Sequence, residues 1–290
     1  MFLPHTDSER EEMLQTIGLQ KLEDMFQSVP EEHRFPDLDL PPALTEMEAF
    51  GQVQELSLAN ESSQDLACFL GAGAYNPYTP AVVDNLLRRG EFLTAYTPYQ
   101  PEISQGTLQV IFEYQSLITL LTGMEISNAS HYDGATATAE AAVQAFHTFR
   151  RKKKKIVLSP GVHPHYRATL RTYLGGYDDL EIVGDNPDSS PFTTPEELLA
   201  QVDGNTSIVI VQYPDFFGRI YNYEKLAESV HEAGALLAIV ANPLALGMLK
   251  PPGEFGADIV CGDGQPLGIP LSYGGPYLGY YATTEKHLRK

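Results

Sequence analysis

The chain has 290 residues, 43% of them hydrophobic and 20% charged, so it can bury a large core and is too apolar to be disordered throughout. With 38 acidic and 19 basic residues its formal charge is -19, which argues against a nucleic-acid-binding surface. The first residues contain neither a basic region nor a long apolar stretch, so we expect no export signal and no contact with a membrane. The two cysteines, Cys68 and Cys261, lie far apart without metal-ligand spacing, which is typical of a reducing compartment and favours the cytoplasm.

The first part of the chain predicts a short helical module and a connector. Ser8-Glu9-Arg10-Glu11 has the capping-box pattern, in which the serine hydroxyl and a glutamate accept from free backbone amides, and apolar residues follow at helical spacing. Residues 28–42 are polar and rich in proline, which indicates an extended connector, and a second helix is expected over about 42–60. We therefore divide the chain into an N-terminal helical segment with its connector, 1–60, and a large domain, 61–290.

Small residues and two helices open the large domain. A loop of small residues, 71–76, precedes a short helix over Pro80–Arg89. A longer helix is expected over Gly106–Gly123, with five apolar residues on one face: Leu108, Ile111, Phe112, Ile118 and Leu121.

From residue 156 onward, short apolar runs alternate with helical stretches. The runs are Ile156–Leu158, Leu180–Val183, Ile208–Val211, Leu236–Val240 and Ile259–Cys261, and helices are expected over Pro195–Val202 and Tyr223–Ala233. Because the runs do not alternate with polar residues, they predict strands buried on both faces of a mostly parallel sheet. The domain is therefore expected to be α/β.

An alanine-rich helix follows Ser130–Ala137, with Asp133 or Gly134 placed to cap it. Small residues at a helix start let an anion approach free backbone amides, so a phosphate could bind there. Close packing of small residues against a sheet explains the same composition without a ligand. Both interpretations stay open on this motif alone.

Two histidines, His163 and His165, follow the first strand of this series, at the end where α/β folds bind ligands. An imidazole there could stack on a flat cofactor, or could be a structural group. Their spacing suggests no third ligand, so we expect no metal site.

The densest polar and aromatic segment is 96–106, in which prolines fix the loop and tyrosines offer hydroxyl groups on stiff side chains. Such a loop suits the presentation of hydrogen-bond donors to a ligand, and it also suits a rigid turn that covers the core. A basic block, Arg150–Lys155, is expected to be a solvated helix end before a strand rather than a phosphate clamp.

Three stretches together resemble one family: Phe69–Asn76, Thr94–Gly106 and Asn128–Thr136. They resemble the glycine decarboxylases, the P-proteins of the glycine cleavage system, and in particular the first subunit in bacteria that divide the enzyme into two chains. The resemblance extends from about Ser8 to the C-terminus and implies the aminotransferase-like, pyridoxal-phosphate-dependent transferase fold (fold type I), with a seven-stranded sheet. Relatives continue past Lys290, so we expect the small C-terminal domain to be incomplete.

Enzymes with this fold usually pair an aspartate with the pyridine nitrogen of the cofactor and bind its aldehyde through a lysine. By register, Val240 stands at the aspartate position and Pro266 at the lysine position. Valine cannot pair with a pyridinium, and proline has no primary amine. The resemblance therefore implies a chain without a catalytic residue of its own.

The resemblance further implies that a second P-protein subunit carries the lysine and the pyridoxal phosphate, and that the working site lies between the two chains. Contacts to that site are expected from Tyr96, Tyr99, Gln100 and Ser104, with the loop 265–276 beside it, whereas a degenerate local site keeps Asp133, Gly134, His163 and His165 as mainly structural groups. The implied reaction decarboxylates glycine, releases carbon dioxide and passes the aminomethyl group to the lipoyl arm of H-protein, in a system completed by the T- and L-proteins.

Two other functions stay open. A self-sufficient aminotransferase or desulfurase would need Lys225 or Lys250 as its amine, but the first lies in an amphipathic helix and the second precedes two prolines. A non-catalytic scaffold would only stabilise a partner, and the tyrosine-rich loop argues against it. The lysines 152–155 are a candidate contact for an acidic carrier such as H-protein.

Overall fold

The computed structural model describes residues 5–63, 65–69, 71–93 and 97–289, so Tyr96 of the tyrosine-rich loop lies outside the described residues. The chain divides into two compact units, Met1–Glu61 and Ser62–Lys290. Among the described helices, none is long and apolar enough to cross a membrane.

The first unit contains two α-helices, α1 (Asp7–Thr16) and α2 (Glu46–Leu58), and two short 3-10 turns, Leu22–Phe26 and Glu31–His33. The prediction that Ser8 caps the first helix was wrong, because Thr6 is the cap. The Thr6 amide donates to the Glu9 carboxylate at 2.6 Å, and the Glu9 amide donates to the Thr6 hydroxyl at 3.4 Å. Thr6 and Glu9 have the three-residue spacing that makes a capping box, so the helix starts two residues earlier than predicted.

The second unit is an α/β domain. Its helices are α3 (Ala81–Leu87), α4 (Gly90–Leu93), α5 (Gln105–Thr122), α6 (Gly134–Thr148), α7 (Pro164–Leu174), α8 (Pro195–Leu199) and α9 (Glu224–Glu232). Its strands are β1 (Ile126–Ser127), β2 (Lys155–Leu158), β3 (Glu181–Val183), β4 (Thr206–Tyr213), β5 (Leu236–Ala241), β6 (Ile259–Asp263) and β7 (Gly279–Thr283). Short 3-10 turns cover Ala245–Gly247, Pro252–Phe255, Gln265–Leu267 and Glu285–His287.

All seven strands form one sheet in the order β1-β7-β6-β5-β4-β2-β3. The pairs from β3 to β6 are parallel, and β7 runs antiparallel to both of its neighbours. The mostly parallel sheet predicted from the apolar runs is therefore confirmed. In the register, Val240 lies between Gln212 of β4 and Cys261 of β6.

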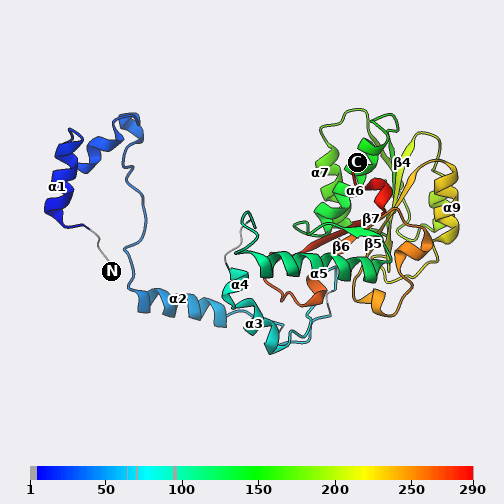
Figure 1. The fold of residues 1–290 in the computed structure, drawn as a ribbon, viewed down its shortest axis with the longest axis horizontal. Helices are drawn as coiled ribbons and strands as arrows, with labels where there is room; N and C mark the ends of the chain where they lie inside the picture. The colour runs from blue at the N-terminus through cyan, green and yellow to red at the C-terminus, as the bar shows by residue number, and fades with distance from the viewer. Residues whose placement is uncertain (1–4, 64, 70, 94–96, 290) are drawn as a thin grey trace. The chain divides into compact units, whose positions relative to one another are not determined.

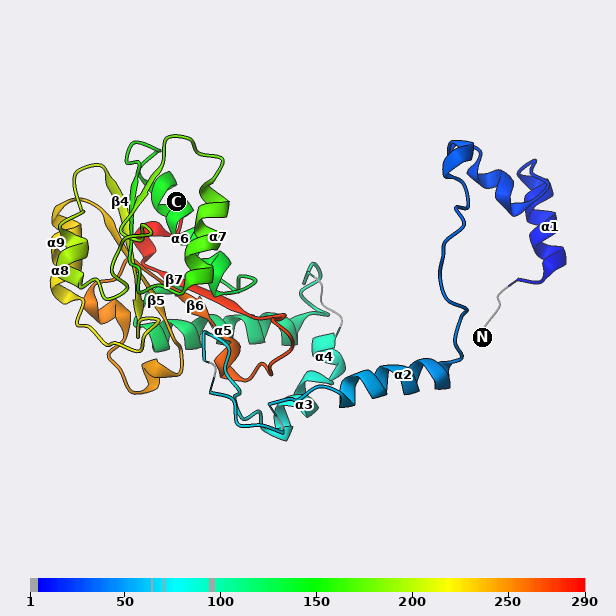
Figure 2. The ribbon, with the colours of Figure 1, turned by 180° about the vertical axis from the view of Figure 1, so that it is seen from behind.

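The sheet separates two hydrophobic layers. Side chains alternate along each strand, so Ile156 and Leu158 face the layer with α6 and α7, whereas Val157 faces the layer with α8 and α9. Figures 1 and 2 show α6 and α7 on one side of the strands and α9 on the other. Alanines on the buried side of α6 let this helix approach the sheet closely, as small side chains allow.

Two helix predictions differ from the structure. In α5, Ile118 is buried and Ile111 and Leu121 are half-buried, but Leu108 and Phe112 are exposed, so the predicted apolar face is only partly correct. Apolar residues surround most of this helix, and periodicity alone could not tell which of them face the sheet. The helix expected over Pro195–Val202 ends at Leu199.

Candidate functional site

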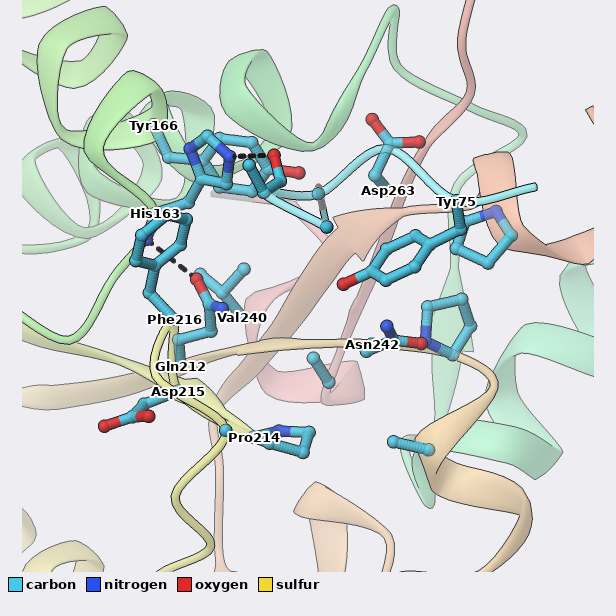
Figure 3. Close-up of a pocket in the computed structure, with 18 residues that line it drawn as sticks. Tyr75, His163, Tyr166, Gln212, Pro214, Asp215, Phe216, Val240, Asn242 and Asp263 are labelled. Carbon is cyan, nitrogen blue, oxygen red and sulfur yellow. Dashed lines mark hydrogen bonds between the residues drawn. The ribbon is translucent and has the colours of Figure 1, made fainter. Parts of the chain in front are cut away.

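A pocket of about 340 Å³ lies at the edge of the sheet where the parallel strands β4, β5 and β6 end. Its walls come from the loop of small residues that begins at Gly71, from the start of α7 and from the segments that follow β4, β5 and β6. Figure 3 shows these segments converging on one space. Because parallel strands place their carboxyl ends at a common edge, residues far apart in sequence share this pocket.

Val240 and Pro266, which were expected at the positions of the cofactor aspartate and lysine, both line the pocket. Val240 belongs to β5 and is almost fully buried, and Pro266 is buried in the 3-10 turn after β6. No lysine is found among the described residues that line the pocket. Lys225 and Lys250 do not line it, and Lys250 forms an ion pair with Glu224 instead. The pocket therefore offers neither a carboxylate at the valine position nor a nearby amine.

The His163 imidazole in the pocket wall is held on both nitrogens. Nδ1 accepts from the backbone amide of His165 at 3.1 Å, so Nε2 carries the hydrogen and donates to the carbonyl oxygen of Ala72 at 2.6 Å. Figure 3 shows the second of these bonds. The ring stacks on Tyr166 with centroids 4.8 Å apart. Burial lowers the pKa of His163, which favours this neutral form.

The second histidine of the pair, His165, lies outside the pocket. His165 is exposed, contributes its backbone amide to His163 and does not line the pocket. Among the described residues there is no group of three or more His, Cys, Asp or Glu side chains arranged to hold a metal ion.

The start of α6 lies behind the pocket, and two of its backbone amides donate to carboxylates. Asp133 caps the helix, with Oδ1 accepting from the Thr136 amide at 2.7 Å. The Gly134 amide donates to Oδ2 of Asp263 at 3.1 Å. Neither Asp133 nor Gly134 lines the pocket, whereas Asp263 does. The Asp263 side chain therefore lies between the pocket and the helix start.

Asp263 lines the pocket but was not predicted as a site residue, although it lies in the stretch aligned with the lysine loop, whereas Gln265 begins the loop 265–276 that was expected beside the shared site. Oδ1 of Asp263 accepts from the Gln265 amide at 2.8 Å. Burial raises the pKa of Asp263 above its ordinary value, while the bonds from the Gln265 and Gly134 amides act in the opposite direction. The only sequence signal was an aspartate and a glutamine two residues apart, and this spacing does not predict which groups the two side chains contact.

Gln265 holds the loop of small residues against the sheet edge. Its buried side chain accepts from the Tyr75 amide at 3.1 Å and donates to the Tyr75 carbonyl oxygen at 2.6 Å and to the Ile269 carbonyl oxygen at 2.7 Å. Thr79 adds a bond from its hydroxyl to the Gly268 carbonyl oxygen at 2.9 Å. The turn that would present a lysine in a cofactor site therefore clamps a neighbouring loop.

The tyrosine-rich loop is not part of this pocket. Tyr99, Gln100 and Ser104 line a separate hollow of about 260 Å³ beside the start of α5. Tyr99 and Gln100 are exposed, and Ser104 precedes α5 without capping it through its hydroxyl. The structure thus groups the predicted residues into two places, one around His163 and one around Tyr99.

Three of the four lysines in the basic block have partners within the domain. Lys153 donates to the carbonyl oxygens of Ala233 and Gly234 at the end of α9, at 3.0 and 2.7 Å. Lys154 pairs with Asp179, and Lys155 pairs with Asp203 at 2.9 Å. The block follows α6, and its last residue, Lys155, begins β2. Residues 150–152 are exposed and 153–155 are half-buried, so the interpretation as a solvated helix end is only partly correct.

The sheet order and the pocket at its carboxyl edge define the class of protein, an α/β chain with the pyridoxal-phosphate-dependent transferase fold of type I. A solved structure titled a NifS-like protein shares the fold, with a TM-score of 0.55 and 13% sequence identity over 73% of this chain and 57% of that one.

This chain belongs to the glycine cleavage system P-protein family, whose model matches residues 1–290. It is 52% identical over 289 residues to a Thermomicrobium roseum protein and 49% identical over 292 residues to one from Bacillus cytotoxicus. Both relatives are named "Probable glycine dehydrogenase (decarboxylating) subunit 1", and the matches cover 100% of this chain and 64% of each relative.

A solved structure of glycine decarboxylase (P-protein) of the glycine cleavage system, in inhibitor-bound form, matches with a TM-score of 0.86 and 44% identity. That match covers 100% of this chain and 64% of the solved one. The chain thus spans just under two thirds of the length of these relatives.

The family and the fold point to pyridoxal phosphate as the cofactor, but the residues of this pocket do not fit it. Val240 cannot pair with the ring nitrogen, and Pro266 supplies no amine. At the start of α6, where an anion would meet free amides, the Gly134 amide already donates to the Asp263 carboxylate.

Proposed function

We propose that this chain is the lysine-free subunit of glycine decarboxylase and acts together with a second P-protein subunit. The proposal is supported by the pocket at the sheet edge of a P-protein family member, which is lined by Val240 and Pro266, the residues expected in place of a carboxylate and an amine, and by no lysine among the described residues. The names of the relatives, which call them subunit 1, also support a second subunit.

In this proposal the second subunit carries the lysine, and its pyridoxal phosphate supplies the electron sink for the loss of carbon dioxide from glycine. The aminomethyl group of glycine is then received by the lipoyl group of H-protein, and the T- and L-proteins act later in the same system. Alone, this chain is inactive, because no described residue of its pocket offers an amine.

The tyrosine-rich loop is the part of this chain that reaches the shared site. Tyr99 is 85% exposed within its own chain, so its hydroxyl is available to donate a hydrogen bond to a ligand held by the second subunit. Tyr96, Gln100 and Ser104 act with it by positioning cofactor or substrate, and the loop 265–276 borders the same site.

An exposed apolar surface on α5 supports the presence of a partner subunit. Phe112, Leu117 and Leu120 are 67%, 64% and 77% exposed. Clusters of exposed large apolar side chains on one element mark contact surfaces rather than free surface. The same helix begins directly after the tyrosine-rich loop, so a partner bound to α5 would bring its own site close to that loop.

The test is reconstitution of the pair. The chain and its lysine-bearing partner are produced separately and together, supplied with pyridoxal phosphate and reduced with borohydride. We expect the covalent label on the partner alone, and glycine-dependent exchange of carbon dioxide only with both chains. A labelled lysine on this chain would instead identify a self-sufficient cofactor enzyme.

The role of the loop is tested in the same complex. Tyr99→Phe removes one hydrogen-bond donor and should lower the exchange rate about tenfold, because one positioning hydrogen bond contributes roughly 1 to 1.5 kcal/mol. Tyr173→Phe on α7 is the matched control, since Tyr173 is also solvent-accessible and lies far from the loop in sequence. Unchanged exchange after substitution of Tyr96, Tyr99 and Gln100 would favour a non-catalytic scaffold.

A further inference from the structure

The start of α6 has the physical properties of an anion site. It is the amino end of a 15-residue helix, its first residues are Gly134 and Ala135, and it lies behind a pocket at the carboxyl edge of a parallel sheet. Backbone amides and the positive end of the helix dipole both favour a negative group at such a place. A negative group is in fact present there, and it belongs to the chain itself.

That group is the Asp263 carboxylate, which bridges the helix start and the turn after β6. Oδ2 accepts from the Gly134 amide at 3.1 Å, and Oδ1 accepts from the Gln265 amide at 2.8 Å. Figure 3 shows the carboxylate on the same side of the pocket as Tyr166. The carboxylate thus uses an amide that a phosphate oxygen would need.

The space around the helix start is also filled. A methyl group added at Gly134 would lie 2.3 Å from the Tyr166 hydroxyl and 2.8 Å from the Asp263 backbone nitrogen. No substituent larger than hydrogen fits at this position without movement of its neighbours. A phosphate that bonded to the Gly134 amide would have to displace the Asp263 carboxylate, because that carboxylate already accepts from this amide.

We propose that Asp263 occupies the anion-binding place at the start of α6 with its own carboxylate, and so excludes phosphorylated ligands from the pocket of this chain. This inference rests on the proposed function, in which the cofactor is carried by the second subunit, and adds a reason beyond the missing lysine. Loss of the lysine prevents covalent attachment only, whereas Asp263 also prevents non-covalent binding of the phosphate, by volume and by like charge.

In the experiment the full chain is titrated with inorganic phosphate, pyridoxal 5′-phosphate and pyridoxal. Binding is measured by calorimetry and by amide hydrogen exchange over residues 133–136. The wild-type chain should show neither saturable binding nor protection of these amides. Asp263→Ser empties the place and should bind pyridoxal 5′-phosphate about tenfold more tightly than pyridoxal, the size of one charge–dipole contact.

Two further variants separate the effect of the Asp263 charge from the effect of its side-chain volume. Asp263→Asn keeps the side-chain volume but removes the charge, so it should bind phosphate more tightly than wild type and less tightly than Asp263→Ser. Asp178→Ser removes one exposed charge just before β3, at the opposite edge of the sheet, and should leave the titrations unchanged. If Asp263→Ser does not fold, the gain in Asp263→Asn carries the test.

Saturable phosphate binding to the wild-type chain with protection of residues 133–136 would overturn the inference. So would folded Asp263 variants that bind no better than wild type. These failures are distinct from a failure of the proposed function, which would appear as a borohydride-labelled lysine on this chain.

Discussion

The clamp formed by Gln265 gives the sharpest test of how the pocket is built. Gln265→Leu keeps nearly the same side-chain volume in a fully buried place but removes three hydrogen bonds, two to Tyr75 and one to Ile269. Each buried bond of this kind contributes about 1 kcal/mol net, and its loss leaves a backbone group without a partner. Because Tyr75 is exposed and Ile269 is half-buried, water can replace some of the bonds, and we expect a loss of about 2 kcal/mol.

The loss of stability should appear first in the loop around Tyr75, before it affects unfolding of the whole domain. A weakening of about 2 kcal/mol corresponds to roughly thirtyfold faster amide hydrogen exchange at Tyr75. Thr79→Val removes a single bond from the same loop, to the Gly268 carbonyl oxygen, so its effect should be about 1 kcal/mol, or roughly fivefold.

The assay is hydrogen exchange read by mass spectrometry, with denaturant unfolding measured in parallel. Gln201→Leu, a half-buried glutamine after α8, controls for the change in composition. Equal exchange at Tyr75 in wild type and Gln265→Leu would refute the reasoning, because the loop would then be held by something other than this side chain.

Three further predictions concern charge and burial. Lys153→Met removes both bonds to the carbonyl oxygens that end α9 and should lower the free energy of unfolding by about 1 kcal/mol in denaturant titrations, whereas Lys152→Met should change it by less than about 0.5 kcal/mol. Burial raises the pKa of the Cys261 thiol to about 12, so a thiol reagent at neutral pH should modify the exposed Cys68 alone and should reach both cysteines only after unfolding. The pKa of Asp263 is raised in the folded chain by burial, so the folded state binds this proton more tightly than the unfolded state does. The free energy of unfolding of wild type relative to Asp263→Asn should therefore fall as pH rises from the ordinary aspartate pKa through the raised one, and then level off; a difference that does not change at all from strongly acidic to neutral pH would contradict this.

Much of the fold could be predicted because it is encoded locally. The unbroken apolar runs around Ile156, Ile208 and Leu237 identify buried parallel strands, and each of them is a strand of the sheet. The predicted helix over Tyr223–Ala233 agrees with α9 to within one residue at each end. Where local signals were ambiguous the prediction failed, as at Ser8, where Thr6 offered the same capping spacing earlier in the chain.

The candidate site was only partly predictable. Once the register of β5 and the turn after β6 is known, the absence of a carboxylate at Val240 and of an amine at Pro266 is a property of the sequence itself. The exposure of Phe112 and Leu120 on α5 was not predictable, because a helix with apolar residues on most of its surface does not reveal which side meets the sheet.

The sequence by itself determined the α/β class of this protein and most of its helices and strands, since these depend on residues that are neighbours in the chain. Only the tertiary structure decided which groups Asp263 and Gln265 contact. Asp263 meets the Gly134 amide across 129 residues, and Gln265 meets Tyr75 across 190. Such pairs depend on strand order and on how α6 and the loop at Gly71 pack against the sheet edge, and no local pattern carries that information.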